Sequence, residues 1–187
     1  MSAPSDSPGT KGATAPLQIL DTLAPEDLQH EVWAACMAPR WYFGNRSTDV
    51  QSSRPFWKMD LDGVEAVDRL WQHARPTCER LARTPLRVER QYANGHTYGL
   101  GGRPHYDDVR PGTYTLLYYP MLAWEPVWEG ETLFFDAAGH VAAGVAIAPN
   151  RAVFFDSRMA HSARAPSRDC PELRVTLAFK LVTAATG

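Results

Sequence analysis

The fold of this chain is decided by its last strand-like run, Arg174-Val175-Thr176-Leu177-Ala178-Phe179-Lys180-Leu181-Val182. Successive side chains of a β-strand point to opposite faces. The odd-numbered positions from 175 to 181 are all apolar, so they predict a face that packs on the core. The even-numbered positions from 174 to 180 form the other face, which carries Arg174 and Lys180. The run therefore predicts a strand with one apolar and one more polar face.

Further strand-like runs precede this one at regular intervals, with Gly, Pro, Asn and Asp residues between them. They are Leu86–Tyr92, Thr113–Tyr119, Thr132–Phe135, Val141–Ile147 and Ala152–Phe155. Many short strands separated by turn residues are typical of an antiparallel sandwich or barrel.

The part of the chain before Thr84 has a helical pattern instead. A first helix is expected to begin at Pro25, a residue that suits the first helical position, and to stop by Pro39. A second is expected after Asp62, with Glu65 as the partner of a capping box. We expect Pro76 to kink or end this helix, with a short continuation to Ala82.

The 187 residues suit one domain. We expect a flexible tail over residues 1–15, because its Ser, Pro, Gly, Thr and Ala residues bury little apolar surface. The domain then spans residues 16–187, with helical support over 16–84 and a β-core over 85–187. The fold class expected is α+β, mainly β, with helices packed on one side of antiparallel sheets.

Composition and charge exclude several classes. The net charge of −2 gives no basic footprint for nucleic acid, and no apolar run approaches the roughly 20 residues that span a membrane. The odd, widely spaced cysteines Cys36, Cys78 and Cys170 match neither a disulfide framework nor a zinc site, and no secretory signal opens the chain. We therefore expect reduced thiols and a cytoplasmic location.

A metal centre is predicted from residues far apart in the sequence. His105 and Asp107 are two residues apart, so on a strand they would share one face. His161 follows the buried-looking run Ala152–Asp156. Two histidines and a carboxylate form the facial triad of non-heme Fe(II) oxygenases, which leaves positions open for co-substrate and oxygen.

Arg174 and Thr176 then supply an anion site. An arginine beside a core is costly to bury unless it is paired. A guanidinium can hold a carboxylate with two hydrogen bonds, and the Thr176 hydroxyl can add another. We therefore expect Arg174 to anchor the distal carboxylate of 2-oxoglutarate, although pairing with a carboxylate of the protein itself is the alternative.

These motifs carry a family resemblance. From about Arg90 to Leu181 the chain resembles the prolyl-4-hydroxylase-like branch of the Fe(II)/2-oxoglutarate-dependent dioxygenases. The matching segments are Arg90–Gly95 leading to His105-Tyr106-Asp107, the core strand Thr115–Pro120, Gly130–Phe134, Pro149–Asp156 before His161, and Arg174-Val175-Thr176-Leu177. The chain departs from the family where Glu129 and Arg151 stand at or near positions that are usually glycine.

The resemblance implies a double-stranded β-helix, a jelly-roll or cupin-like core braced by the N-terminal helices. It implies an enzyme that holds Fe(II) with the triad and consumes 2-oxoglutarate and O2. It also places the hydroxyls of Tyr92 and Tyr119 near 2-oxoglutarate. Related halogenases have Gly or Ala where this chain has Asp107, so hydroxylation or a similar oxidation is favoured over halogenation.

Substrate is expected among aromatic loops and the glycine-rich stretch before the H-x-D motif. The candidate residues are Trp41, Tyr42, His96, Arg103, Trp124 and Trp128. Short loops favour a small polar substrate, amino-acid-like or a natural-product intermediate. A protein or peptidyl hydroxylase, a cupin-like metalloprotein that does not use 2-oxoglutarate, and an inactive binding module stay open as alternatives, and the oligomeric state is not determined by the sequence.

Overall fold

The structure is a computed structural model that describes residues 17–46 and 55–184. The tail expected over residues 1–15 lies outside the described residues. Two antiparallel sheets are present. The large one has the order β1-β8-β5-β10-β4-β3-β2, and the small one has the order β7-β6-β9.

The large sheet combines strands from the whole chain. Its members are β1 (Gln18–Leu20), β8 (Arg151–Asp156), β5 (Thr113–Tyr119), β10 (Arg174–Thr183), β4 (Leu86–His96), β3 (Phe56–Asp60) and β2 (Tyr42–Asn45). The small sheet consists of β7 (Val141–Val145), β6 (Thr132–Phe135) and β9 (His161–Ala163). The mainly β, jelly-roll-like fold predicted from the sequence is confirmed.

All six predicted strands exist, with boundaries that differ by a few residues. The largest difference is β4, which runs on to His96 instead of ending at Tyr92. Four strands were not predicted: β1, β2, β3 and β9. Three of them lie before residue 84, so this part of the chain supports the core with strands as well as helices. They are three to five residues long and owe their form to pairing with distant strands, such as β1 with β8.

Both predicted helices are present. Helix α1 spans Glu26–Cys36 with Pro25 at its N-cap, and α2 spans Glu65–Ala82. The capping box expected at Asp62 is wrong, because the N-cap is Val64 and no side chain caps it. The helix also continues through Pro76 to Ala82, since its apolar stripe packs on the sheet and tertiary contacts outweigh the lost backbone hydrogen bond. No described helix has the length and apolarity to cross a membrane.

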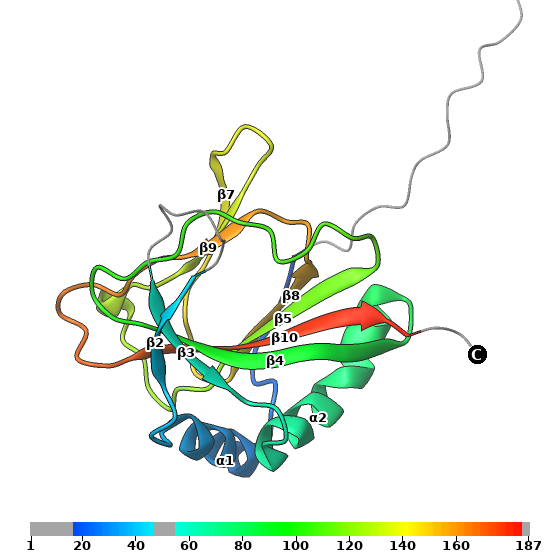
Figure 1. Cartoon of the computed structure of the whole chain (residues 1–187), viewed down its shortest axis with the longest axis horizontal. Coiled ribbons are helices and arrows are strands. Elements are labelled where there is room, and N and C mark those ends of the chain that lie inside the picture. The colour runs from blue at the N-terminus through cyan, green and yellow to red at the C-terminus, as the bar shows by residue number, and fades with distance from the viewer. Residues whose placement is uncertain (1–16, 47–54, 185–187) are drawn as a thin grey trace, which may run out of the picture.

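The molecule is layered. Figure 1 shows α1 and α2 below the large sheet, with β7 and β9 above it. At the centre of the large sheet, β10 pairs with both β4 and β5. Its apolar face points to the helices, where the ring of Phe179 stacks on Trp71 with centroids 6.1 Å apart. Its other face points between the two sheets, and there it carries the candidate site.

Four non-glycine residues of the described chain take the backbone conformation that glycine favours, and two of them lie at or next to departures from the family pattern. Glu129 has φ +56° and Asn150 has φ +60°. Glu129 is one of the two departures from the family pattern, and Asn150 directly precedes the other. The Asn150 amide accepts a hydrogen bond from the Ala24 N–H (2.9 Å) and donates one to the Ala24 carbonyl (2.8 Å), while Tyr118 donates to it at 2.9 Å. The asparagine thus fastens the segment before α1 to the β-core.

Candidate metal centre

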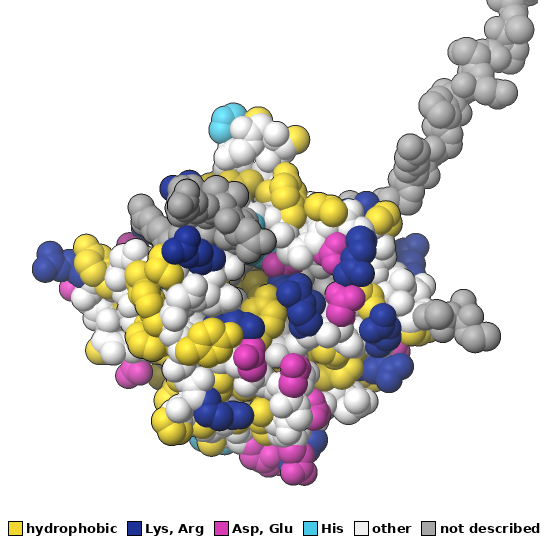
Figure 2. Space-filling model, in the orientation of Figure 1, with side chains coloured by type: hydrophobic (Ala, Val, Ile, Leu, Met, Phe, Trp, Pro, Cys, Tyr) yellow, Lys and Arg dark blue, Asp and Glu magenta, His cyan; other side chains and the backbone are white. Residues whose placement is uncertain are grey.

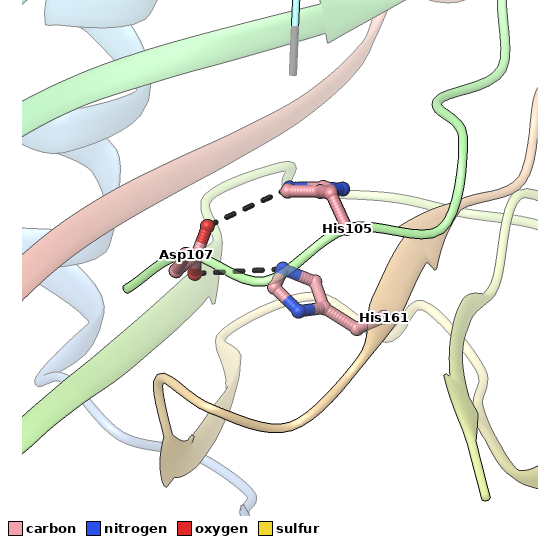
Figure 3. A group of neighbouring side chains, drawn as sticks. All are labelled: His105, Asp107 and His161. Atoms are coloured by element: carbon pink, nitrogen blue, oxygen red, sulfur yellow. Dashed lines mark ion pairs between the residues drawn. The ribbon is translucent and has the colours of Figure 1, made fainter. Parts of the chain in front are cut away.

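His105, Asp107 and His161 come together between the two sheets. The Nε2 atom of His105 lies 3.5 Å from Oδ1 of Asp107, and Nε2 of His161 lies 3.4 Å from Oδ2 (Figure 3). One ligand atom from each residue falls within 4.8 Å of the others. Two chain segments, one with His105 and Asp107 and the other with His161, thereby converge on one point although they are far apart in sequence.

Backbone hydrogen bonds position these residues. His161 begins β9 and forms an isolated antiparallel bridge with His105, with N–H···O distances of 3.0 and 2.9 Å. The Asp107 N–H donates to the carbonyl of Ser157 at 3.0 Å. The strand expected over 105–107 is wrong, because apart from this bridge the segment is irregular. His105 and Asp107 nevertheless point to the same site, because backbone hydrogen bonds to the chain around β9 hold their segment in place.

The two imidazoles are oriented as metal ligands. Nδ1 of His105 donates to the carbonyl oxygen of Arg103 (2.9 Å), and Nδ1 of His161 donates to that of Met159 (3.0 Å). A carbonyl oxygen only accepts, so Nδ1 carries the proton in each ring and the Nε2 lone pair faces Asp107. Burial lowers the pKa of His161 to about 4. Its ring is therefore neutral at pH 7, as a metal ligand must be.

Asp107 is buried and strongly bound. Its Oδ2 accepts a hydrogen bond from the Thr115 hydroxyl at 2.7 Å and forms an ion pair with Lys180. Burial alone would raise the pKa of this carboxyl, but Lys180 and then His161 outweigh burial and hold the pKa well below its usual value. Burial would likewise lower the pKa of Lys180, and Asp107 reverses this, so the pKa is raised. Both groups are charged at pH 7.

Arg174 is fully buried on the same face of β10. Its guanidinium donates to the Gly130 carbonyl (2.6 Å), to Thr176 (3.0 Å) and to Thr132 (3.1 Å). No ion pair among the described residues includes it, and burial lowers its pKa. Each terminal nitrogen keeps a second N–H that no described residue accepts. A buried guanidinium with unused N–H donors is suited to binding a carboxylate.

Gly130 makes this arrangement sterically feasible. It has φ +88°, and a Cβ there would lie 3.2 Å from Cδ of Arg174 and 3.1 Å from Ile147. Behind the guanidinium, the Tyr119 hydroxyl is 2.7 Å from the Thr132 hydroxyl. Tyr119 is thus fully buried next to Arg174, and its place near 2-oxoglutarate stays a prediction.

The triad and Arg174 share one pocket of about 250 Å³. Its lining is mostly polar and includes Lys58, Asp60, Arg90, Asn94 and His96 besides the residues above. On the face shown in Figure 2, basic and acidic side chains lie intermingled.

His96 lies in β4 directly opposite Arg174 and is 2% exposed. Its Nδ1 and the Oδ1 of Asn94 are buried without a partner in the described part of the chain. Burial, and then the charge of Arg174, lower the pKa of His96 well below its usual value. A neutral imidazole and an amide therefore face the pocket with unmet hydrogen-bonding capacity.

The remaining candidates for substrate contact lie elsewhere. Trp41 packs near Gly95 and donates to the Cys36 carbonyl at 2.9 Å, and Trp124 packs edge-on against Trp128. Tyr42 is on the edge strand β2, and Arg103 lines a second, shallower hollow beside Gly99–Gly102. None of these five residues lines the pocket of the triad. Their contact with a substrate stays a prediction.

Sequence reasoning did not assign roles to Lys180, Thr115 or Thr132. Lys180 was placed correctly on the face of Arg174 by strand alternation, but alternation does not show that it reaches Asp107. Tyr92, expected near 2-oxoglutarate, has its ring 5.8 Å from the Lys180 ammonium and 5.0 Å from that of Lys58. The available signal was a lysine on the same face of the strand as Arg174.

No protein-family model matches the sequence, and no curated protein matches it. Solved structures do match. The α-ketoglutarate-dependent non-heme epimerase SnoN of nogalamycin biosynthesis has a TM-score of 0.71 at 14% identity, over 90% of this chain and 78% of its own. A 2-oxoglutarate-Fe(II) oxygenase family protein from Burkholderia pseudomallei gives 0.70 at 10% identity, over 89% and 84%.

A prolyl-4-hydroxylase from Pseudomonas putida matches with a TM-score of 0.62 at 17% identity, over 90% of this chain and 92% of its own. At these sequence identities the matched structures do not indicate the substrate of this chain. They agree on its architecture. Together with the buried His-Asp-His group, they confirm the resemblance at the level of fold. The chain has the fold of the Fe(II)- and 2-oxoglutarate-dependent oxygenases.

Proposed function

We propose that this protein is an Fe(II)- and 2-oxoglutarate-dependent oxygenase that hydroxylates an unactivated C–H bond and releases succinate and CO2. One observation carries the proposal. The pocket that holds two histidines and an aspartate also holds a fully buried guanidinium without a carboxylate partner among the described residues. A metal site alone gives no reason to bury that cation, whereas a dianionic co-substrate does.

The residues divide the work. His105, Asp107 and His161 would hold Fe(II) through two neutral imidazoles and one carboxylate. Arg174 would bind the distal carboxylate of 2-oxoglutarate, while Thr176, Thr132 and the Gly130 carbonyl hold the guanidinium in one orientation. The bound iron, 2-oxoglutarate and O2 supply the oxidising power, and the protein orients the reactants and limits access of water.

Two neighbours would complete the co-substrate site. His96 is neutral and faces Arg174, so its unpartnered ring nitrogen can hydrogen-bond a carboxylate oxygen. The Tyr119 hydroxyl is hydrogen-bonded to the Thr132 hydroxyl and would act by fixing it beside Arg174. The ring of Tyr92 lies 5.8 Å from the Lys180 ammonium, and Tyr92 borders the pocket further along β4.

A small polar molecule is the substrate we propose. The pocket of about 250 Å³ must hold 2-oxoglutarate as well as the reacting part of the substrate. Its outer lining is charged or amidic, with Lys58, Asp60, Arg90 and Asn94, which favours a charged or zwitterionic compound over a flat apolar one. A peptidyl substrate is the second candidate, since matched structures include a prolyl hydroxylase with a peptide fragment as well as a carbocyclase of nogalamycin biosynthesis.

The first test is an anaerobic titration of metal-free protein with Fe(II) and then 2-oxoglutarate, monitored in the visible region. We expect a weak charge-transfer band only when both are present. His161→Ala should abolish the band, and Arg174→Ala should move it to much higher 2-oxoglutarate concentration. Iron binding without a band would favour a cupin-like metalloprotein, and binding of neither would favour an inactive module.

The second test separates the substrate classes. Succinate release in air would be measured with pools of small polar metabolites and, separately, with a peptide library. Stimulation by a metabolite pool together with a hydroxylated free compound supports the small-molecule reading. Stimulation only by peptides, with a mass increase of one oxygen on the peptide, would instead support a peptidyl substrate.

A further inference from the structure

Lys180 is a buried charge that the proposed reaction does not require. Among the charged side chains that line the pocket, only Arg174, Lys180 and Asp107 are nine-tenths or more buried in the described structure. Arg174 is 0% and Lys180 6% exposed, and the side chain of Asp107 is 6% exposed. Two cations and one anion thus share an interior from which water is largely excluded.

The two cations lie at different ends of the pocket. Arg174 and Lys180 are six positions apart on β10, which separates their Cα atoms by roughly 20 Å at the usual rise of a strand. Lys180 contacts Asp107 and Tyr92, and Arg174 contacts neither. Lys180 is therefore next to the metal ligands and away from the anchor of 2-oxoglutarate.

We propose that Lys180 is a positioning residue that competes with the metal for the charge of Asp107, and so makes tight metal binding depend on the dianionic co-substrate. This inference rests on the proposed function. The ammonium of Lys180 forms an ion pair with the carboxylate of Asp107. A divalent metal bound to Asp107 shares that carboxylate with Lys180, and the two cations repel each other in a poorly screened interior.

Charge counting shows why the co-substrate matters. With neutral histidines, Arg174, Lys180 and Asp107 sum to +1, and a divalent metal brings the buried site to +3. The two carboxylates of 2-oxoglutarate return it to +1. Each ligand therefore favours the other, and by linkage the factor by which 2-oxoglutarate tightens metal binding equals the factor by which metal tightens 2-oxoglutarate binding.

Lys58 provides a matched control. It also borders the pocket, and its ammonium lies 5.0 Å from the Tyr92 ring, where that of Lys180 lies 5.8 Å away. Its ion pair is with Asp60 at 2.6 Å, however, and no ion pair in the described part of the chain joins it to Asp107. A general effect of positive charge in the pocket would appear in both lysines, whereas competition for Asp107 would appear in Lys180 alone.

The experiment measures Co(II) affinity with and without saturating 2-oxoglutarate, by calorimetry on metal-free protein. It compares wild type with Lys180→Met, Lys180→Gln, Lys180→Arg and Lys58→Met. We expect Lys180→Met and Lys180→Gln to bind Co(II) alone at least about tenfold more tightly, because a nearby cation is removed. The tightening by 2-oxoglutarate should shrink by a similar factor, while Lys180→Arg and Lys58→Met should keep the wild-type factor.

The outcomes separate this inference from the function on which it rests. If wild type binds no Co(II), or 2-oxoglutarate changes nothing, the proposed function fails. If wild type shows coupled binding but Lys180→Met and Lys180→Gln bind Co(II) as wild type does or more weakly, the inference alone is overturned. It is also overturned if Lys58→Met has the same effect. Circular dichroism checks folding, and the glutamine variant keeps a polar group where methionine might disturb the fold.

Discussion

The two faces of β10 differ in chemistry, although their side chains alternate along one strand. Towards the helices, Val175, Leu177, Phe179 and Leu181 are almost fully buried among apolar neighbours. Towards the small sheet, Arg174 and Lys180 are just as buried but sit among hydroxyls, carbonyls and a carboxylate. Equal burial thus has different consequences: burial of the apolar face contributes to stability, whereas burial of the charges on the polar face costs desolvation free energy.

The largest expected effect is on the polar face. Arg174→Met removes the guanidinium but keeps an apolar side chain in its space. We expect 2-oxoglutarate affinity to fall at least about thirtyfold, since losing one partner of a buried charge pair typically costs about 2–5 kcal/mol. The free energy of unfolding should change by less than about 1.5 kcal/mol, because an unpaired buried cation is itself unfavourable. Calorimetric titration and urea unfolding measure the two quantities. A large loss of stability would show that Arg174 is structural.

A substitution on the apolar face should lower stability and leave 2-oxoglutarate affinity unchanged. Phe179→Ala removes a fully buried ring that stacks on Trp71, and a Phe→Ala change in a core costs about 3–5 kcal/mol. Urea unfolding should show this loss. At a temperature where the variant is folded, its 2-oxoglutarate affinity should equal that of wild type. Loss of affinity in fully folded protein would mean that the two faces are not independent.

The metal-free protein should lose stability in mild acid. Burial puts the pKa of His161 at about 4 in the folded state, against 6.5 as the ordinary value. The unfolded chain therefore binds the proton more readily between these values, and stability falls as pH drops from about 6.5 towards 4, by roughly 3 kcal/mol. Unfolding at pH 7, 5.5 and 4.5 checks this. His161→Gln should remove most of that dependence, and an unchanged slope would point to other groups.

The smallest effect should come from a surface tether. Asp21 pairs with Arg151 at 2.6 Å near the start of β8, but its side chain is 61% exposed. The Arg151 side chain beside it lowers the pKa of Asp21, and solvent screens the pair. Asp21→Asn should reduce the unfolding free energy by less than about 1 kcal/mol, measured at low and high salt. A larger loss that persists in high salt would indicate that the pair holds β1 in place.

Much of the fold was predictable from local pattern. Alternation predicted β10 and both of its faces, and helical periodicity predicted α1 and α2. The short strands β1, β2, β3 and β9 were not predictable in this way, because their conformation depends on partners far away in the sequence. The course of α2 through Pro76 likewise depends on packing against the sheet.

The candidate site was likewise predictable from the sequence only in part. The residue types and spacing of His105, Asp107, His161 and Arg174 were enough to propose a metal and an anion, because that chemistry requires those side chains. The backbone bridge between His105 and His161, the free donors of Arg174 and the contact of Lys180 with Asp107 were decided only by the tertiary structure. The sequence determines which groups are available and which strand face they take. Only the packing of the two sheets determines which of them meet, since the residues that meet lie tens of positions apart on different segments of the chain.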